Sequence, residues 1–304
     1  MARFKRVAVL MGGVSTEREI SLLSGKAVLD GLVAAGYDAV PHILESESIG
    51  ELPAGVEAVF LALHGGYGES GGAQADLDRM GVPYTGSGAA ASRMAMDKIL
   101  SKRLFDRHAI PSARWAVVEA GDDRMPFPAP LVAKTPEGGS SVGVGIALAE
   151  AGWPAALAEA RRYGGDVLAE RFIPGREWTV GILDGEALPA IEIQAPEWYD
   201  FAAKYKAHGT TRYVFPEDPA DRELVARCQD IARSVFRAFG ARGLGRVDFR
   251  ITPGGEPFVL ELNTLPGFTS TSLLPKAAAK AGLPFPGLCA RVMETAAFDT
   301  PTKD

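Results

Sequence analysis

The amino-acid sequence predicts an α/β protein built from three parts. In roughly the first 80 residues, strand patterns alternate with helix patterns, which is typical of a small parallel sheet. The middle of the chain carries strand patterns around one helix, and the last part contains two hairpin turn signals, Asp184-Gly185 and Gly254-Gly255. A chain of 304 residues also exceeds one ordinary core, so two or three lobes are expected.

The N-terminal part begins with a short buried strand over residues 6–11, which Gly12-Gly13 ends. Ligands gather beyond the carboxyl ends of strands in such a sheet, so residues that follow its strands are candidates for binding. The other elements expected here are helices from about 16 to 35, at 72–80 and at 88–107, and strands at 37–44 and 57–66.

The middle part is expected to form a compact α+β lobe, and the last part a lobe of mainly antiparallel strands. The middle elements are strands at 114–120, 130–136, 142–149 and 166–173, with a helix at 153–165. The last part has strands within 175–194, a polar loop at 195–218, a helix near 220–239, a second hairpin and a helical tail.

Composition excludes several classes of protein. A hydrophobic content of 47% with 23% charged residues is typical of soluble globular proteins, and no run of 18 apolar residues predicts a membrane span. The net charge of −6 gives no general attraction to nucleic acid or to anionic membranes. Cys228 and Cys289 have neither metal-ligand nor disulfide spacing, and Cys228 is expected to be a buried thiol. A cytoplasmic protein that binds neither nucleic acid nor membranes is therefore expected.

The second hairpin places two carboxylates opposite each other. Side chains alternate along a strand, so Glu261 and Asn263 share one face of "FVLELN". With a two-residue turn at Gly254-Gly255, Asp248 lies across from Glu261, and Arg246 lies across from Asn263. At a separation of about 5 Å and an effective dielectric constant near 20, two such carboxylates repel by roughly 3 kcal/mol.

Two interpretations account for this repulsion. Arg246 and Arg250 lie on the same face and could absorb the charge. Alternatively, the two carboxylates and the Asn263 amide hold a divalent cation, because oxygen-only ligands suit Mg²⁺. Magnesium usually shares its coordination sphere with phosphate oxygens, so the second interpretation requires a phosphate site nearby.

The common phosphate-binding motifs are missing from the sequence, but "KTPEGGSSVGVG" at 134–145 is a candidate. Its small residues would let backbone amides approach an anion closely, and its serines add hydroxyl donors. The lysines that could serve the same site are Lys98, Lys134 and Lys204.

With these residues assembled, the chain resembles the D-alanine–D-alanine ligase family of ATP-grasp enzymes over nearly its whole length. The order and spacing of eight motifs carry the resemblance: "GGVSTEREISLLSG", "LALHGGYGESG", "PYTGSG", "MDKILSK", "KTPEGGSSVG", "YDFAAKY", "GRVDF" and "ELNTLPGFTSTSLLP". The resemblance implies a three-lobed ATP-grasp fold. Its parts would be a Rossmann-like domain at 1–90, a central lobe at 91–171 and a C-terminal lobe at 172–304.

The resemblance also assigns roles on the nucleotide side. It implies that ATP is bound with two Mg²⁺ ions, which Mn²⁺ could replace, and that Glu261 bridges them. A loop at Ser140 and Ser141 would close over the phosphates. The implied metal ligands are Asp248, Glu261 and Asn263. The implied nucleotide contacts are Lys98, Lys134, Ser140, Ser141 and Lys204 for phosphates, Glu170, Phe172 and Ile173 for adenine, and Glu177 for ribose.

On the amino-acid side, the resemblance implies that Glu17 pairs with the ammonium of the first D-alanine. From the residues alone, Glu17 is a favourable acid at a helix N-terminus, beside a capping-box spacing at Thr16 and Glu19. The other implied substrate and catalytic residues are His64, Ser141, Tyr205, Arg246, the amide of Gly267, Ser272 and the amide of Leu273. Arg246 could equally form a salt bridge to the hairpin carboxylates.

The implied reaction joins two D-alanines with ATP, through a D-alanyl phosphate, to supply a peptidoglycan precursor. D-Alanine–D-lactate ligases are the close alternative, but they typically lack the tyrosine matched by Tyr205. A non-catalytic nucleotide-binding regulator would be expected to lack a metal ligand or a phosphate lysine, and none is missing here. The chain departs from the commonest pattern at Phe201, where tyrosine is frequent, and at Thr135 in "KT". A homodimer is common in the family.

Overall fold

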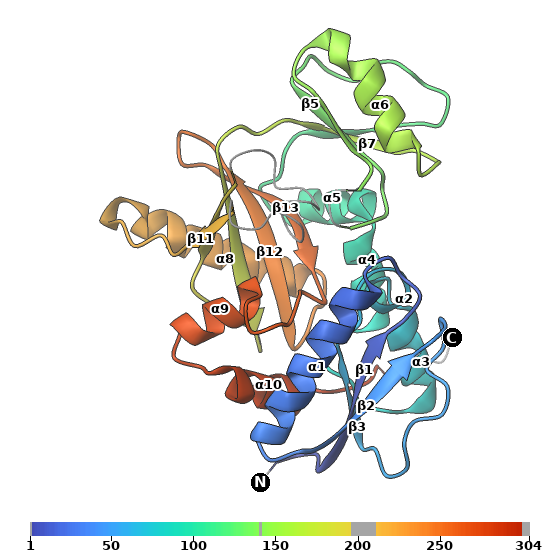
Figure 1. The fold of residues 1–304 in the computed structure, drawn as a ribbon. Helices are drawn as coiled ribbons and strands as arrows, with labels where there is room; N and C mark the ends of the chain where they lie inside the picture. Colours follow the sequence, from blue (N-terminus) through green and yellow to red (C-terminus); the bar gives the residue numbers. More distant parts are fainter. Residues whose placement is uncertain (1, 140–141, 196–210, 300–304) are drawn as a thin grey trace.

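The N-terminal part forms the expected parallel sheet. In the computed structural model, residues 2–139, 142–195 and 211–299 are described. The sheet has the order β2-β1-β3, with all its pairings parallel, and helix α1 packs on β1 (Figure 1). The elements are β1 (Arg6–Gly12), α1 (Arg18–Ala34), β2 (Asp38–Leu44), β3 (Ala58–Leu61), α2 (Gly66–Glu69) and α3 (Gly72–Met80).

The start of α1 differs from the sequence expectation. The helix begins at Arg18 with Glu17 as its N-cap residue, and no side chain caps it, so the capping box at Thr16 and Glu19 was wrong. The Ser15 hydroxyl instead accepts a hydrogen bond from the Glu17 amide at 3.2 Å, and it donates to the His64 carbonyl at 2.6 Å. Ser15 thus connects the residues before α1 with His64, in the loop that follows β3.

The single helix expected at 88–107 is two helices, α4 (Ala89–Met96) and α5 (Lys98–Arg107). Asp97 separates them because its backbone is extended and its side chain accepts hydrogen bonds from the amides of Ile99 and Leu100, at 2.8 and 3.0 Å. This is an ordinary N-cap arrangement, and it makes Lys98 the first residue of the new helix.

The central lobe is a four-stranded antiparallel sheet of order β4-β7-β5-β6, covered by α6, and it extends away from the other two parts (Figure 1). Strand β6 and α6 pack closely: a methyl group at Gly145 would lie 2.5 Å from the Ala156 Cα. The elements are β4 (Trp115–Val118), β5 (Leu131–Lys134), β6 (Val144–Ala147), a 3₁₀ turn (Glu150–Gly152), α6 (Trp153–Arg161) and β7 (Val167–Arg171).

The C-terminal part is built on an antiparallel sheet of order β11-β10-β8-β12-β13, with β9 paired to β8. Helix α8 packs its apolar side, including buried Cys228, against this sheet, and α5 adds Leu104 and Phe105 to the same core. The elements are β8 (Arg176–Leu183), β9 (Glu186–Ala187), β10 (Ile191–Gln194), β11 (Arg212–Val214), a 3₁₀ turn (Pro219–Asp221), α8 (Arg222–Ala238), β12 (Leu244–Ile251), β13 (Pro257–Asn263), α9 (Leu273–Lys280) and α10 (Phe285–Glu294).

The first and last parts of the chain share one hydrophobic core. Helix α10 lies beside α1 (Figure 1), and Cys289 of α10 packs against Gly31 of α1. Phe268, which follows β13, packs on Phe60 of β3 with 5.4 Å between ring centroids. This core holds the carboxyl ends of the parallel sheet next to the loop that leaves β13. Within the described residues, no helix has the length and apolar character needed to cross a bilayer.

The second hairpin has the pairing expected at its carboxylates, but its turn is longer than expected and a bulge restores the register. Asp248 pairs with Glu261 and Arg246 with Asn263, as the sequence predicted. The turn is longer than two residues, since Thr252 pairs with Glu256 through a hydrogen bond of 3.0 Å. A bulge between Phe249 and Asp248 then shifts the register by one residue. Without that shift Asp248 would oppose Leu260, and Glu261 would face the core.

Candidate active site

Asp248 is the most strongly held carboxylate of the hairpin. The residue is 6% exposed, and its carboxylate accepts hydrogen bonds from Thr179 at 2.6 Å, Asn263 at 2.9 Å and Arg246 at 2.9 and 2.8 Å. The bidentate pair with Arg246 shows that one arginine does absorb charge on this face, as the first interpretation proposed. Asp248 is therefore anchored whether or not a cation is bound.

The second arginine serves a different carboxylate. Arg250 forms an ion pair with Glu177 on β8 at 3.3 Å and donates to the carbonyls of Ile173 and Gly175 at 3.2 and 2.8 Å. Glu177 lies directly across from Arg250 in the β8–β12 pairing, which places this ion pair beside the hairpin carboxylates.

A cavity of 440 Å³ connects the hairpin with the N-terminal part and with α9. Glu261 and Asn263 form part of its wall from β13, and Arg246 contributes from β12. The sequence-predicted substrate residues found in the same wall are Glu17, His64, Gly267, Ser272 and Leu273. Segments far apart in the chain are thus brought together around one space of the size that small ligands occupy.

The N-terminal side of the cavity is acidic. The Glu17 carboxylate lies beside Gly65, where an added methyl group would come within 3.0 Å of it. His64 is 6% exposed; its Nε2 is 3.0 Å from the Ser24 hydroxyl and its Nδ1 is 3.7 Å from Glu69. Glu69 also lines the cavity, so this end presents two carboxylates and an imidazole to any bound ligand.

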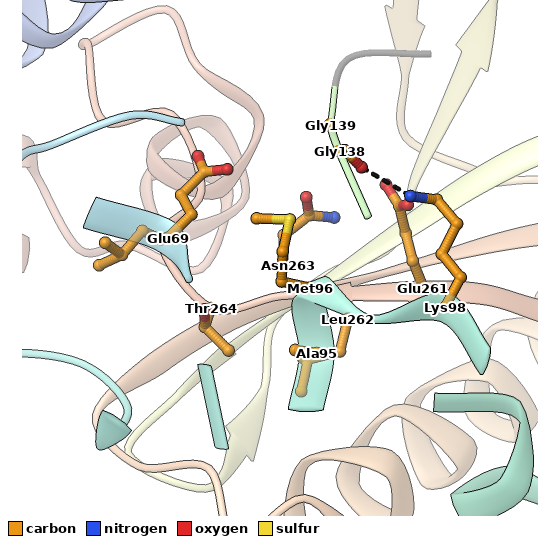
Figure 2. Close-up of a pocket in the computed structure, with 11 residues that line it drawn as sticks. Glu69, Ala95, Met96, Lys98, Gly138, Gly139, Glu261, Leu262, Asn263 and Thr264 are labelled. Atoms are coloured by element: carbon orange, nitrogen blue, oxygen red, sulfur yellow. Dashed lines mark hydrogen bonds between the residues drawn. The ribbon is translucent and has the colours of Figure 1, made fainter. Parts of the chain in front are cut away.

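Lys98 lies next to the hairpin in a smaller adjoining pocket of 40 Å³ (Figure 2). Its amine donates to the Gly138 carbonyl at 2.6 Å, and Figure 2 shows it beside the Glu261 carboxylate, with Glu69 on the opposite side. Burial lowers the pKa of Lys98 and the charge of Lys134 adds to this effect, while Glu261 and Glu170 oppose it. Two lysines and two carboxylates therefore influence one another here.

Glu170 lies between two lysines at the base of the central lobe. One carboxylate oxygen contacts Lys134 of β5 and the other contacts Lys102 of α5. Burial raises the pKa of Glu170, but the two lysines outweigh it and leave the pKa at about 2. Burial lowers the pKa of Lys102, which Glu170 opposes. Glu170 is consequently ionised at neutral pH and holds the amines of both Lys102 and Lys134.

The segment after β7 carries the other residues expected to contact adenine and ribose. The Phe172 amide donates to the Pro130 carbonyl at 3.0 Å, and the Ile173 carbonyl accepts from Arg250. Both residues are half-buried. Glu177 is on β8, paired with Arg250 as described above. These three residues lie along the stretch from the end of β7 to the start of β8, where the chain passes from the central sheet to the C-terminal sheet.

The N-terminus of α9 forms the far end of the cavity. Ser272 is the N-cap residue, but its hydroxyl bonds Thr269, at 2.8 Å to the hydroxyl and 3.1 Å to the amide. The amides of the first helical turn have no intrahelical acceptor, and such amides favour a negatively charged group. Gly267 lies close by: a methyl group added at its Cα would be 3.3 Å from the Ser272 hydroxyl oxygen.

Five positions named from the sequence lie outside the described residues. These are Ser140, Ser141, Phe201, Lys204 and Tyr205.

Sequence reasoning missed several residues of this region. Glu69 lies in a motif that was noted, but nothing in the residue pattern distinguished it from a surface acid. Lys102 could have been found, because it is four residues after Lys98 and so lies on the same side of a helix. Thr179 gave no signal, since its contact with Asp248 depends on strand pairing between distant segments. Lys276, in the wall of the cavity, was also missed.

The hairpin residues fit a hard divalent cation. Among the described residues no group of three His, Cys, Asp or Glu side chains has metal-binding geometry. The hairpin instead offers two carboxylates in directly paired positions and the Asn263 amide, whose nitrogen already donates to Asp248. The Asn263 oxygen and the Glu261 carboxylate are then the groups directed to the cavity, and oxygen ligands of this kind suit Mg²⁺.

Comparison with known proteins identifies the family. A family model described as "D-ala D-ala ligase C-terminus" matches residues 103–294. The chain is 47% identical to a D-alanine–D-alanine ligase of Anaeromyxobacter sp. (strain Fw109-5), covering 97% of each chain, and 45% identical to one of Geobacter sulfurreducens, covering 96% of this chain and 94% of that one.

Solved structures agree with the sequence relatives. The crystal structure of D-alanine–D-alanine ligase from Bacillus anthracis complexed with ATP has a TM-score of 0.83 at 32% identity, covering 96% of this chain and 97% of that one. The ligase from Coxiella burnetii has a TM-score of 0.80 at 26% identity, covering 96% and 95%. The fold, the order of motifs and these likenesses show that the chain belongs to the D-alanine–D-alanine ligase family.

Proposed function

We propose that this protein joins two D-alanine molecules to D-alanyl-D-alanine with ATP, forming ADP and phosphate, for the synthesis of peptidoglycan precursors. The observation that carries the proposal is the single 440 Å³ cavity. An acidic pocket at Glu17, the oxygen-rich hairpin at Glu261 and the N-terminus of α9 all open into it. Such a cavity provides separate places for an ammonium group, a metal-bound nucleotide and a carboxylate.

The nucleotide would bind between the central and C-terminal sheets. Lys98 and Lys134 lie where they could neutralise phosphate oxygens, and Glu170 holds Lys134 in place. Ile173 would offer its amide to adenine, since its carbonyl is engaged by Arg250, and Phe172 would offer its carbonyl, since its amide bonds Pro130. The remaining proposed contacts are Glu170 to the adenine amino group, Glu177 to ribose, and Ser140, Ser141 and Lys204 to the phosphates.

Asp248, Glu261 and Asn263 are the residues that would hold two Mg²⁺ ions. When bound, the ions supply positive charge that neutralises phosphate oxygens as negative charge develops on them. Arg246 keeps Asp248 oriented through its bidentate contact. The directly paired position of Glu261, produced by the bulge, directs its carboxylate to the same site.

The first D-alanine would bind with its ammonium at Glu17 and close to His64, which Ser24 and Glu69 orient. Ser141 and Tyr205 are proposed to complete this side with Glu17. The carboxylate of this D-alanine would attack the γ-phosphate of ATP, breaking its bond to ADP, so that a D-alanyl phosphate forms and ADP leaves. The lysines and Arg246 offset the charge that accumulates in this step.

The second D-alanine would place its carboxylate at Ser272 and the Leu273 amide. Its amine attacks the acyl carbonyl and phosphate leaves. Arg246 and the Gly267 amide, which line the same cavity, are proposed to donate to the oxyanion of the tetrahedral intermediate. Binding at the α9 N-terminus sets the distance between the amine and the carbonyl, so that the two substrates react as neighbours.

Further features of the proposal concern the whole molecule. The three lobes are taken as 1–90, 91–171 and 172–304, and the protein is proposed to act as a cytoplasmic homodimer. The three separate sheets support the division into three lobes. A homodimer and a cytoplasmic location follow from the family alone.

The experiment is a product assay on the purified chain with ATP, Mg²⁺ and D-alanine. One ADP, one phosphate and one D-alanyl-D-alanine are expected per turnover, and excess EDTA should stop the reaction. A parallel reaction with D-alanine and D-lactate tests the alternative ligase. A depsipeptide formed in preference to the dipeptide, or no D-alanine-dependent ATP turnover, would contradict the proposal.

A further inference from the structure

Lys276 of α9 lies in the wall of the cavity, one helical turn beyond Ser272 and Leu273. Residues three and four positions apart occupy the same side of a helix. Lys276 is therefore on the side that presents Leu273 and Ser272 to the cavity. Its amine is 4.4 Å from the centroid of the Tyr213 ring, and Tyr213 lines the same cavity from β11.

This lysine has no acidic partner among the described residues. Its surroundings at the α9 end of the cavity are Tyr213, Thr271, Ser272 and Leu273, and burial lowers its pKa. The cavity's carboxylates, Glu17, Glu69 and Glu261, come from the other elements that line it.

The next lysine on the helix shows a different arrangement. Lys280 is four residues further on and lies over Phe215, 5.3 Å from its ring centroid. It also forms an ion pair with Glu217, and it is exposed and absent from the cavity wall. The two lysines thus cover two aromatic residues of one segment, but Lys276 lines the cavity and, within the described residues, pairs with no carboxylate.

We propose that Lys276 binds the carboxylate of the acceptor substrate and makes the enzyme select acceptors that carry a free carboxylate. This inference rests on the proposed function, because it assigns the acceptor to the α9 end of the cavity. The helix amides of the first turn would orient the carboxylate, and the lysine would supply a full positive charge at its outer side. Tyr213 keeps the amine in place by the cation–π contact.

The test is a competition between two acceptors in one reaction. ATP and D-alanine are supplied with an equal concentration of D-alaninamide, which has the amine but no carboxylate. The ratio of D-alanyl-D-alanine to D-alanyl-D-alaninamide is measured by mass spectrometry. Because both products come from the same donor and the same enzyme molecules, the ratio does not depend on how much enzyme is folded.

Lys276→Met should lower this ratio by roughly tenfold to a hundredfold, the loss expected for one charge-assisted hydrogen bond in a partly buried site. Lys276→Arg keeps the charge and should stay within a few-fold of the unchanged chain. Lys280→Met removes a lysine from the same helix and the same kind of ring contact, and should leave the ratio unchanged.

The outcomes separate the two levels of the proposal. If the unchanged chain makes no dipeptide, the proposed function fails. If it makes dipeptide and Lys276→Met keeps the same ratio, the role of Lys276 is refuted and the function stands. A raised KM for ATP with an unchanged ratio would place Lys276 at a phosphate and would also overturn the inference.

Discussion

Replacing Glu170 by glutamine should destabilise the protein even though the side chain keeps its size. Glu170 is 2% exposed and contacts Lys102 and Lys134 with its two oxygens. The substitution leaves both lysines facing a neutral amide. Lys102, also 2% exposed, would lose its carboxylate partner and keep a contact of 3.5 Å to the Ala113 carbonyl and its place over the Phe105 ring, 5.9 Å from the ring centroid. Its buried charge would then be uncompensated.

The size of the effect follows from the pKa of Glu170. The folded state lowers it from 4.5 to about 2. A shift of that size corresponds to about 3 kcal/mol. The burial of Lys102 offsets part of this stabilisation, because burial disfavours its charged form and lowers its pKa. Removing one partner from a buried ion pair nevertheless costs about 3–5 kcal/mol, because the other charge stays buried. We expect a loss of about 3 kcal/mol and a fall in Tm of roughly 6–12 °C.

The stability that Glu170 contributes should decrease as the pH falls. A carboxyl group whose pKa is lowered by folding contributes stability above its unfolded pKa, and this is lost as the pH falls through the folded pKa. The difference in Tm between the unchanged chain and Glu170→Gln should therefore be constant from about pH 6 to 8. It should narrow as the pH falls below 4.5 toward 2.

Differential scanning calorimetry measures these differences directly. Glu159→Gln is the matched control, because Glu159 pairs with Arg162 on the surface of the same lobe and should leave Tm unchanged. Adding Lys102→Met to Glu170→Gln should recover part of the loss, since one uncompensated charge is removed. A Tm for Glu170→Gln equal to that of the Glu159→Gln control would refute the reasoning.

Two further substitutions test the hairpin and the central lobe. Glu261→Gln should keep the Tm within about 2 °C, because Glu261 is only half-buried, but it should abolish D-alanine-dependent ATP hydrolysis; turnover at the unchanged rate would show that Glu261 binds no essential cation. Gly145→Ala should cost about 1–3 kcal/mol, because the added methyl group would overlap the Ala156 backbone. Gly254→Ala, where the nearest atom is 3.7 Å away, is its control, and equal thermal unfolding of the two variants would contradict the described packing of β6 on α6.

The sequence predicted the positions of most strands and helices because their periodicity was strong. The α3 and α6 patterns and all four strands of the central lobe were found where the hydrophobic residues indicated them. The break at Asp97 was missed, although Asp before a lysine-rich helical pattern is a recognisable N-cap signal. The capping box at Thr16 failed because α1 begins only at Arg18, so Glu17 is its N-cap residue and Thr16 lies before it.

The hairpin shows most clearly what sequence reasoning can and cannot reach. The pairing of Asp248 with Glu261 was predicted correctly, but the two-residue turn was wrong, and a longer turn and a bulge together give the same register. Side-chain alternation reports which residues share a face, but not where an extra residue is inserted. The Lys102–Glu170–Lys134 network depends on contacts between separate elements, so only the structure could place its members together.

The claim on which the account depends most is that the hairpin holds the cations that carry the nucleotide. The direct measurement is anomalous diffraction from a crystal grown with Mn²⁺ and a non-hydrolysable ATP analogue. We expect manganese peaks about 2.0–2.5 Å from carboxylate oxygens of Asp248 and Glu261 and from the Asn263 amide oxygen, in contact with the phosphates. A nucleotide bound with its manganese elsewhere, and these three side chains without metal, would contradict the account.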